Sequence, residues 1–322
     1  RYTENAGAYQ EYLKARYYLN KRTTRWLKRG VEHFQQAIAI DPGYATAYAG
    51  LADSYTLLVT WEAMAPLEGF PKAKAAAKQA LQIEPSLAEA HASLGHALLH
   101  TWHWEDSERA FRTAVDSNPG YAAAHQWYAE YLAAMGRFDE AIAEAFRAQE
   151  LDPLSVVHSA DVGFMLYYSR RYDEAVEQLQ HAIDMEPDFW IPHHLLGLTY
   201  TQKGMHEQAL AECRTAMALS GKGALSVVLI GHAYAVSGER SDALAVIEQL
   251  NELSKRRYFS PYRIALIQAG LGNDEEAFDC LEEAYARRDA RLIWLKVDPA
   301  LDSLRSDSRF TEMLRRVGFS EE

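Results

Sequence analysis

The feature that most constrains this chain is a spacing of 34 residues that recurs along most of its length. Two residue types mark the spacing, and each forms a series of its own. The first series consists of the prolines Pro85, Pro119, Pro153 and Pro187. The second consists of small residues, Ala73, Ser107, Ala141, Ala175, Ala209, Ala243 and Ala277. Two series in one register predict a chain built from repeated structural units of this length.

Residues 120–153 show what is repeated. Apolar residues follow the three-and-four spacing of an amphipathic helix over 122–135 and again over 138–151, so the unit is predicted to be a pair of helices. Gly136 lies between them, where a residue without a β-carbon can adopt positive φ. Gly204, Gly238 and Gly272 take the same place in later units, and Arg170 is the exception. A helix pair this short cannot bury its own apolar faces, so neighbouring units must cover them.

In this register the units resemble the tetratricopeptide repeat. One unit carries the matching residues His91, Leu94, Gly95, Leu98, Ser107, Phe111, Ala114 and Pro119. Another carries Val162, Gly163, Leu166, Ala175, Leu179, Ala182 and Pro187. The resemblance implies an all-α fold, a right-handed superhelical solenoid of about eight helix pairs with a C-terminal capping helix. We expect the array over residues 1–288 and the cap over residues 289–322. The repeats are expected to end near Pro42, Pro85, Pro119, Pro153, Pro187, Gly221, Lys255 and Arg288.

One unit is longer than the others. The small position Ala73 follows the corresponding Gly30 by 43 residues instead of 34, which places nine additional residues around positions 60–69. They either lengthen the two helices or form an apolar loop at the edge of the array. An insertion in a repeat protein is sometimes a binding feature, but local packing is the favoured interpretation.

Charge and composition restrict the kind of partner. The formal net charge is −12, and an acidic chain argues against direct contact with nucleic acid. No apolar run approaches the roughly 20 residues of a membrane span, so no membrane is expected in this segment. The two cysteines, Cys213 and Cys280, lie about two repeats apart, too far for a disulfide. Unpaired thiols suit a reducing compartment, and we expect a cytoplasmic protein.

The two ends of the chain also carry a resemblance. Residues 295–319, LKVDPALDSLRSDSRFTEMLRRVGF, and residues 8–23, AYQEYLKARYYLNKRT, resemble parts of bacterial multidomain regulators. In those proteins a similar array follows a DNA-binding, kinase or cyclase module. The chain also lacks an initiator methionine. The resemblance implies that it is the sensing, docking or regulatory region of a larger bacterial protein.

Sequence motifs for chemistry are incomplete, so no enzyme, cofactor or metal is predicted. His206-Glu207 is not followed by the second histidine of a metalloprotease motif. His96 and His100 share a helix face, Glu130 could approach them from the next repeat, and two histidines with a carboxylate can bind zinc. Because the chain has twelve histidines, a role as polar filler is the favoured interpretation.

The family resemblance places the binding surface on the concave face, which the first helix of each pair lines. Carried over position by position, it gives these candidate partner-binding residues: Asp53, His96, His100, Gln126, Trp127, Glu130, Phe164, Tyr167, Tyr168, His194, Leu198, His232 and Tyr262. A mixed polar and aromatic groove suits a protein or peptide segment, and its acidic end favours a partner with basic residues. The expected function is therefore a non-catalytic binding scaffold. Two alternatives remain open, a self-association or intramolecular regulatory module and a small-molecule sensor.

Overall fold

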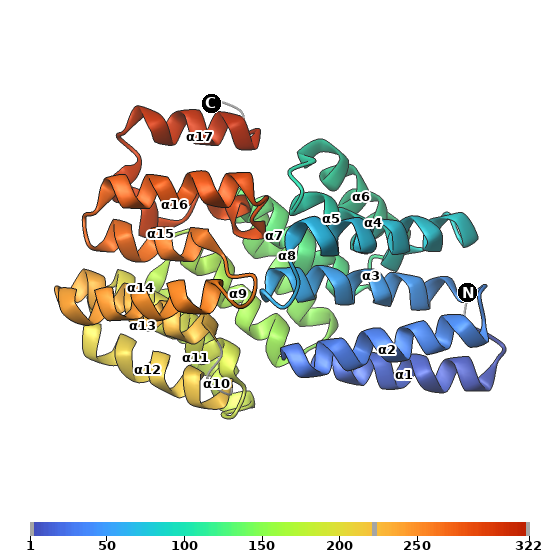
Figure 1. Cartoon of the computed structure of the whole chain (residues 1–322). Helices are drawn as coiled ribbons and strands as arrows, with labels where there is room; N and C mark the ends of the chain where they lie inside the picture. Colours follow the sequence, from blue (N-terminus) through green and yellow to red (C-terminus); the bar gives the residue numbers. More distant parts are fainter. Residues whose placement is uncertain (1–2, 221–223, 320–322) are drawn as a thin grey trace. The chain divides into compact units, whose positions relative to one another are not determined.

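A computed structural model describes residues 3–220 and 224–319 of the chain (Figure 1). These residues form seventeen α-helices and two 3-10 helices, and no strand occurs among them. The all-α prediction is confirmed. The first eight helices are α1 (Ala6–Asn20), α2 (Thr24–Ile40), α3 (Ala45–Thr60), α4 (Pro66–Ile83), α5 (Ala88–Leu99), α6 (Trp104–Ser117), α7 (Ala122–Ala134) and α8 (Phe138–Leu151). Then follow α9 (Val156–Tyr168), α10 (Tyr172–Met185), α11 (Trp190–Gln202), α12 (His206–Leu219), α13 (Ala224–Ser237), α14 (Arg240–Ser254), α15 (Pro261–Gly270) and α16 (Asp274–Ala286).

The chain divides into two compact units, and the boundary falls inside α7. Unit 1 is Arg1–Tyr131 and unit 2 is Leu132–Glu322. Within each unit consecutive helices pack as antiparallel neighbours, and the first helices of successive pairs also touch: α3 packs on α5 in unit 1, and α9, α11, α13 and α15 pack in series in unit 2. We call the surface formed by these first helices the first-helix face. The expected repeat end at Gly221 lies outside the described residues, and no helix within them is long and apolar enough to cross a membrane.

The series of small residues marks the point where the two helices of a pair cross. All seven members are fully buried. The Ser107 hydroxyl donates a hydrogen bond of 2.8 Å to the carbonyl of Gly95 on the partner helix, so the backbones approach closely there. On the partner helix of another pair, a β-carbon added to Gly163 would lie 2.5 Å from Cγ of Leu179. The spacing read from the sequence therefore identifies the helix-crossing positions.

The turn between the helices of a pair requires a left-handed residue. Gly136, Gly204, Gly238 and Gly272 have φ between 70° and 86°. Arg170 and Trp102 occupy the same position in their repeats with φ of 64° and 62°. Because a β-carbon makes this conformation unfavourable, these two turns are held by contacts elsewhere.

A fourth series, not recognised in the sequence, consists of histidines six residues after the proline that ends a repeat. The Nε2 atoms of His91, His125 and His193 lie 2.8, 3.0 and 3.0 Å from the carbonyl oxygens of Pro85, Pro119 and Pro187. Because a carbonyl oxygen only accepts hydrogen bonds, each ring donates to the carbonyl of the proline that follows the helix end. These histidines link successive repeats through hydrogen bonds, so they do more than occupy polar positions on the surface.

The insertion at residues 60–69 lengthens both helices of its pair. Helices α3 and α4 contain 16 and 18 residues, whereas most other helices contain 12 to 15. The short connection between them packs Trp61 and Met64 against Leu19, Leu27 and Leu58. The interpretation as local packing agrees with these contacts.

After α16 the chain no longer forms helix pairs. It continues as the 3-10 helices η1 (Ala290–Trp294) and η2 (Pro299–Leu304) and ends in α17 (Ser308–Val317). An aspartate begins each element: Asp289, Asp298 and Asp307 accept hydrogen bonds from the backbone amides of Arg291, Ala300 and Arg309. Helix α17 lies along α16 (Figure 1), and Arg309 and Arg316 bind Glu275 and Glu282 there. Helix α17 is the capping helix expected from the sequence.

Candidate functional site

The thirteen candidate residues belong to the first helices of their pairs, from α3 to α15, and His100 is the residue that caps α5. Six belong to unit 1 and seven to unit 2. Eight are buried: Asp53, His96, His100, Trp127, Tyr167, Tyr168, His232 and Tyr262. The other five are partly buried: Gln126, Glu130, Phe164, His194 and Leu198. None is exposed, and the contacts that bury these side chains differ between the two units.

In unit 1 the acidic candidate Asp53 is buried and is hydrogen-bonded within the chain. Asp53 accepts a hydrogen bond of 2.5 Å from Ser93, and burial raises the pKa of Asp53 to about 6 although Ser93 and Arg16 lower it. A carboxyl group in this position does not offer a charge to a partner. Of the two acidic residues on which the preference for basic partners was based, only Glu130, with a side chain 21% exposed, reaches solvent.

The remaining unit 1 candidates form one polar and aromatic cluster. The indole of Trp127 stacks on His96 with centroids 4.7 Å apart and an interplanar angle of 13°. Phe70 stacks on His100 at 5.7 Å and 10°. The Glu130 carboxylate lies beside both imidazoles. Side chains from α4, α5 and α7 therefore hold the two histidine rings in fixed positions next to a partly exposed carboxylate.

In unit 2 the first-helix face is covered by the chain itself, and residues 289–305 form the cover. We call this stretch the C-terminal segment. Its Trp294 stacks on Tyr168 with centroids 4.1 Å apart and an interplanar angle of 6°. Phe164 meets the same indole edge-on at 5.2 Å. The aromatic residues expected to anchor a partner instead hold a segment that lies more than 120 residues later in the chain.

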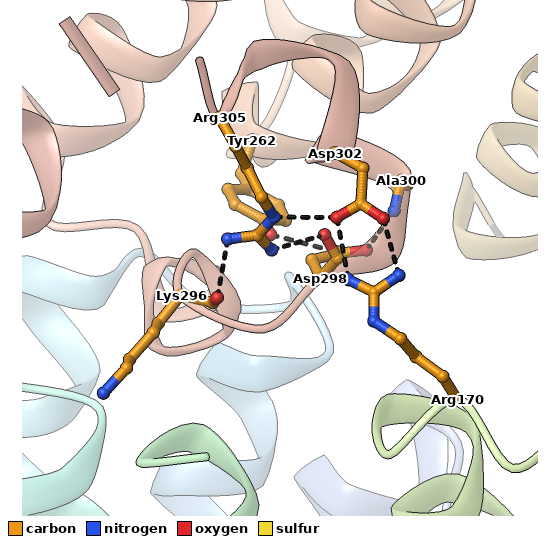
Figure 2. A network of polar contacts seen from close by, with 7 residues as sticks. All are labelled: Arg170, Tyr262, Lys296, Asp298, Ala300, Asp302 and Arg305. Atoms are coloured by element: carbon orange, nitrogen blue, oxygen red, sulfur yellow. Dashed lines mark hydrogen bonds and ion pairs between the residues drawn. The ribbon is translucent and has the colours of Figure 1, made fainter. Parts of the chain in front are cut away.

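Polar contacts fix the C-terminal segment at the same face (Figure 2). Asp298 accepts a hydrogen bond of 2.9 Å from the Tyr262 hydroxyl, and Asp289 accepts one of 2.6 Å from Ser260. Asp302 binds the Arg170 guanidinium through two contacts of 2.5 and 2.8 Å. The segment thus touches both α15 and the turn that follows α9.

Arg305 holds the segment in its folded shape. Its guanidinium donates to the carbonyl oxygens of Lys296 and Asp298 at 2.7 and 3.1 Å, and its Nε donates to Asp302 at 2.7 Å. Asp302 therefore receives two arginines (Figure 2), and they hold the pKa of its carboxyl below the usual value. Asp302 thus takes part both in the internal fold of the segment and in its attachment to the turn that follows α9.

The sequence held a signal for this arrangement that was not used. Residues 292–297 are an apolar run between Asp289 and Asp298, too short for a helix of the array. Leu292, Ile293 and Leu295 are completely buried. An apolar run outside the repeat register must be buried somewhere, and the first-helix face of unit 2 is where it lies.

Arg170 gives a prediction about the balance between backbone strain and ion pairing. Arg170→Ala should lower the free energy of unfolding by up to about 1 kcal/mol, because it removes a partly exposed ion pair and keeps a β-carbon at positive φ. Arg170→Gly loses the same pair but relieves the strained turn by about 1 kcal/mol. The free energy of unfolding of Arg170→Gly should therefore equal that of the native chain. Urea unfolding of both variants measures the difference, and equal losses in the two would contradict the account of the turn.

Two histidines in unit 2, the partly buried His194 and the buried His232, predict a dependence of stability on pH. Burial, together with Arg263 and Arg291, holds the pKa of His194 well below its ordinary value, and burial likewise lowers the pKa of His232. The unfolded chain then binds protons that the folded chain resists. Stability should be retained above pH about 6.5 and lost below it, with a slope of up to about 1.4 kcal/mol per pH unit for each histidine.

The neighbouring His193 provides a control of opposite sign. A hydrogen bond of 2.6 Å to Glu212 raises its pKa, so its contribution is present at low pH and is lost as the pH rises through that raised value. Denaturation between pH 5 and 8 should show a shallower acid loss for a His194→Gln, His232→Gln double variant. It should show a steeper loss for His193→Gln. Parallel curves for all three proteins would contradict the assignment.

Comparisons with known proteins bear on the fold. Residues 103–155 and 166–224 match the family model described as tetratricopeptide repeat. The chain is similar to a chain in the crystal structure of the APC/C hetero-tetramer Cut9–Hcn1, with 18% identity, a TM-score of 0.62, and coverage of 91% of this chain and 52% of that one. It is also similar to yeast Tom70, with 15% identity, a TM-score of 0.54, and coverage of 98% and 69%. No curated protein sequence matches.

The matched ranges include the units in which the proline, small-residue and turn positions are most regular. The structural similarities extend over nearly the whole chain and agree with the order of helix pairs. Residues 103–155 and 166–224 therefore match the tetratricopeptide repeat, and the similar solved structures agree with an all-α array of helix pairs.

Proposed function

We propose that the chain is a non-catalytic scaffold that binds a protein or peptide segment on its first-helix face, as the docking or regulatory region of a larger bacterial signalling protein. Repeats of this type commonly serve protein–protein interaction. The observation that carries the proposal is the C-terminal segment on unit 2. A face that stacks an indole on one aromatic ring, meets it edge-on with another and hydrogen-bonds an acidic side chain has the chemistry to hold a peptide.

The two units suggest two docking positions. On unit 1, Gln126 and Glu130 are the partly exposed candidates, and the carboxylate favours a basic side chain of the partner. On unit 2 a partner would have to take the place of the C-terminal segment. The expectations of a cytoplasmic location and of no direct contact with nucleic acid belong to this proposal, with the acidic net charge of −12 in support.

The test begins with the full chain as bait in a bacterial lysate and identifies captured proteins by mass spectrometry. A purified client is then titrated against three variants. Glu130→Ala, in unit 1, and Phe164→Ala, in unit 2, are expected to separate the docking positions, and one of them should weaken binding at least tenfold. The control is Leu154→Ala, a side chain 89% exposed in the turn before α9. If only the control change weakened the affinity for the client, binding would have to occur away from the first-helix face.

The intramolecular alternative is favoured by the same segment. If the C-terminal segment competes with a client for unit 2, then loosening it should tighten client binding. Asp302→Asn is suitable because it weakens the Arg170 contact without creating a cavity. Increased affinity, reversed by a synthetic peptide of residues 289–305, would support an intramolecular regulatory module. Unchanged affinity in a client that needs Phe164 would count against competition.

A further inference from the structure

The cluster of His96, His100 and Glu130 in unit 1 has the geometry of a metal site. Its three potential ligand atoms converge: His96 Nε2 lies 3.3 Å from His100 Nε2 and 3.3 Å from a Glu130 oxygen. His100 Nε2 lies 3.8 Å from the other carboxylate oxygen. All three belong to a single compact unit. We propose that these residues bind a divalent zinc-like cation, contrary to the expectation of no metal from the sequence.

The distances agree better with a shared cation than with direct hydrogen bonds. Good N–H···O bonds measure about 2.9–3.0 Å, and both imidazole–carboxylate separations are longer. The 3.3 Å between the two imidazole nitrogens is that of a long hydrogen bond at most. Around a tetrahedral zinc with bonds of about 2.0–2.1 Å, neighbouring ligand atoms lie about 3.3–3.4 Å apart. The two edges that meet at His96 Nε2 have that length. One ligand atom from each residue lies within 4.8 Å of the other two, so a rotation of the partly exposed carboxylate would close the third edge.

The helix supplies the spacing of the histidines. His96 lies in the last turn of α5, and His100 is the residue that caps this helix. Residues four apart share one face of a helix, so both imidazoles point the same way. Stacking on Trp127 and Phe70 fixes the ring planes. Little side-chain freedom would be lost on binding, which favours affinity.

Charge and donor type select the cation. Two imidazoles and one carboxylate suit zinc and its neighbours nickel, copper and iron, and they are poor ligands for calcium or magnesium, which prefer oxygen. The Glu130 carboxylate offsets one positive charge, and its exposed side opens toward solvent. Three protein ligands leave a fourth position for water.

One feature limits the affinity. The Nδ1 atom of His96 finds no hydrogen-bond partner among the described residues, whereas zinc-binding histidines usually donate that N–H to a carboxylate or carbonyl. Loss of such an outer contact typically weakens metal binding about 10- to 100-fold. We therefore expect a site that loads reversibly and can be stripped by a chelator.

The experiment uses the full chain, stripped with a chelator and titrated with Zn²⁺ and Co²⁺ alone. One ion per chain, a visible Co²⁺ spectrum typical of tetrahedral coordination, and a rise in melting temperature are expected. Glu130→Gln is nearly isosteric and should weaken binding at least about tenfold. His96→Ala should abolish it. His103→Gln, an exposed histidine outside the cluster, should bind like the native chain.

Each outcome decides the proposal. Thermal melting of each variant without metal shows whether it folds. If His96→Ala does not fold, Glu130→Gln still tests the site. Absence of saturable binding by the native chain would overturn the site, as would Zn²⁺ binding unchanged by Glu130→Gln. X-ray absorption adds an independent check. A first shell without two imidazoles would mean that the ion is bound elsewhere.

Discussion

Replacing Trp294 by alanine is expected to lower the free energy of unfolding by about 3–5 kcal/mol, the usual cost of deleting a buried aromatic side chain. The indole is 2% exposed and lies between Tyr168 and Phe164. Its removal leaves a cavity between the C-terminal segment and α9. Urea unfolding of the full chain measures the loss.

Leu154→Ala is the matched control, because this side chain is almost fully exposed and should change stability by less than about 0.5 kcal/mol. The loss of stability in Trp294→Phe should lie between those of Trp294→Ala and Leu154→Ala, since phenylalanine keeps a ring for Tyr168 to contact. A Trp294→Ala protein as stable as the control would mean that the C-terminal segment is not part of the folded core of unit 2.

Replacing Ala175 by leucine is expected to cost about 1–3 kcal/mol through overpacking. Ala175 is completely buried and holds the position at which Ser107 of an earlier unit touches the backbone of its partner helix. Three additional carbons would force α9 and α10 apart. Because each repeat is stabilised by its neighbours, the strain should lower the melting temperature of the adjoining repeats as well.

The control for this change is Ala143→Leu on the exposed side of α8. Leucine and alanine have similar helix propensities, so the control should be nearly neutral. A neutral result for Ala175→Leu as well would show that the 34-residue register does not mark the helix crossings.

The repeat architecture could be predicted from the sequence because it depends on local, periodic requirements. The helix-crossing positions demand a small side chain in every unit, and the turn demands a left-handed residue, so each leaves a trace every 34 residues. Arg170 broke the glycine series in the sequence, and the structure shows that it still adopts positive φ. Its side chain has a second role, the ion pair with Asp302.

The burial of side chains on the first-helix face could not be predicted in the same way. The helix pattern assigned the candidate residues to the first helices of their pairs, yet the burial of their side chains depends on contacts that no repeat period encodes. Arg170 and Asp302 are 132 residues apart, and the C-terminal segment appears once. Likewise, the His96 and His100 spacing was visible, but the convergence with Glu130 depends on how α5 packs against α7. Non-periodic tertiary contacts of this kind leave little trace in a single sequence.

The two units therefore differ in how a partner could reach them. In unit 1 the candidate residues form a tight cluster with one partly exposed carboxylate. In unit 2 a folded segment of the chain already covers the aromatic residues. A partner that binds unit 2 would have to displace this segment, and its affinity would be lowered by the free energy that holds the segment in place.

The central claim is that residues 289–305 close the first-helix face of unit 2, and hydrogen–deuterium exchange of the full chain tests it most directly. We expect the amides of residues 292–304 to exchange as slowly as those of α9 and α15, and Trp294→Ala to accelerate them together with α9. Exchange of residues 292–304 at the rate of an unfolded peptide, with α9 and α15 still protected, would contradict the claim and leave the aromatic face open.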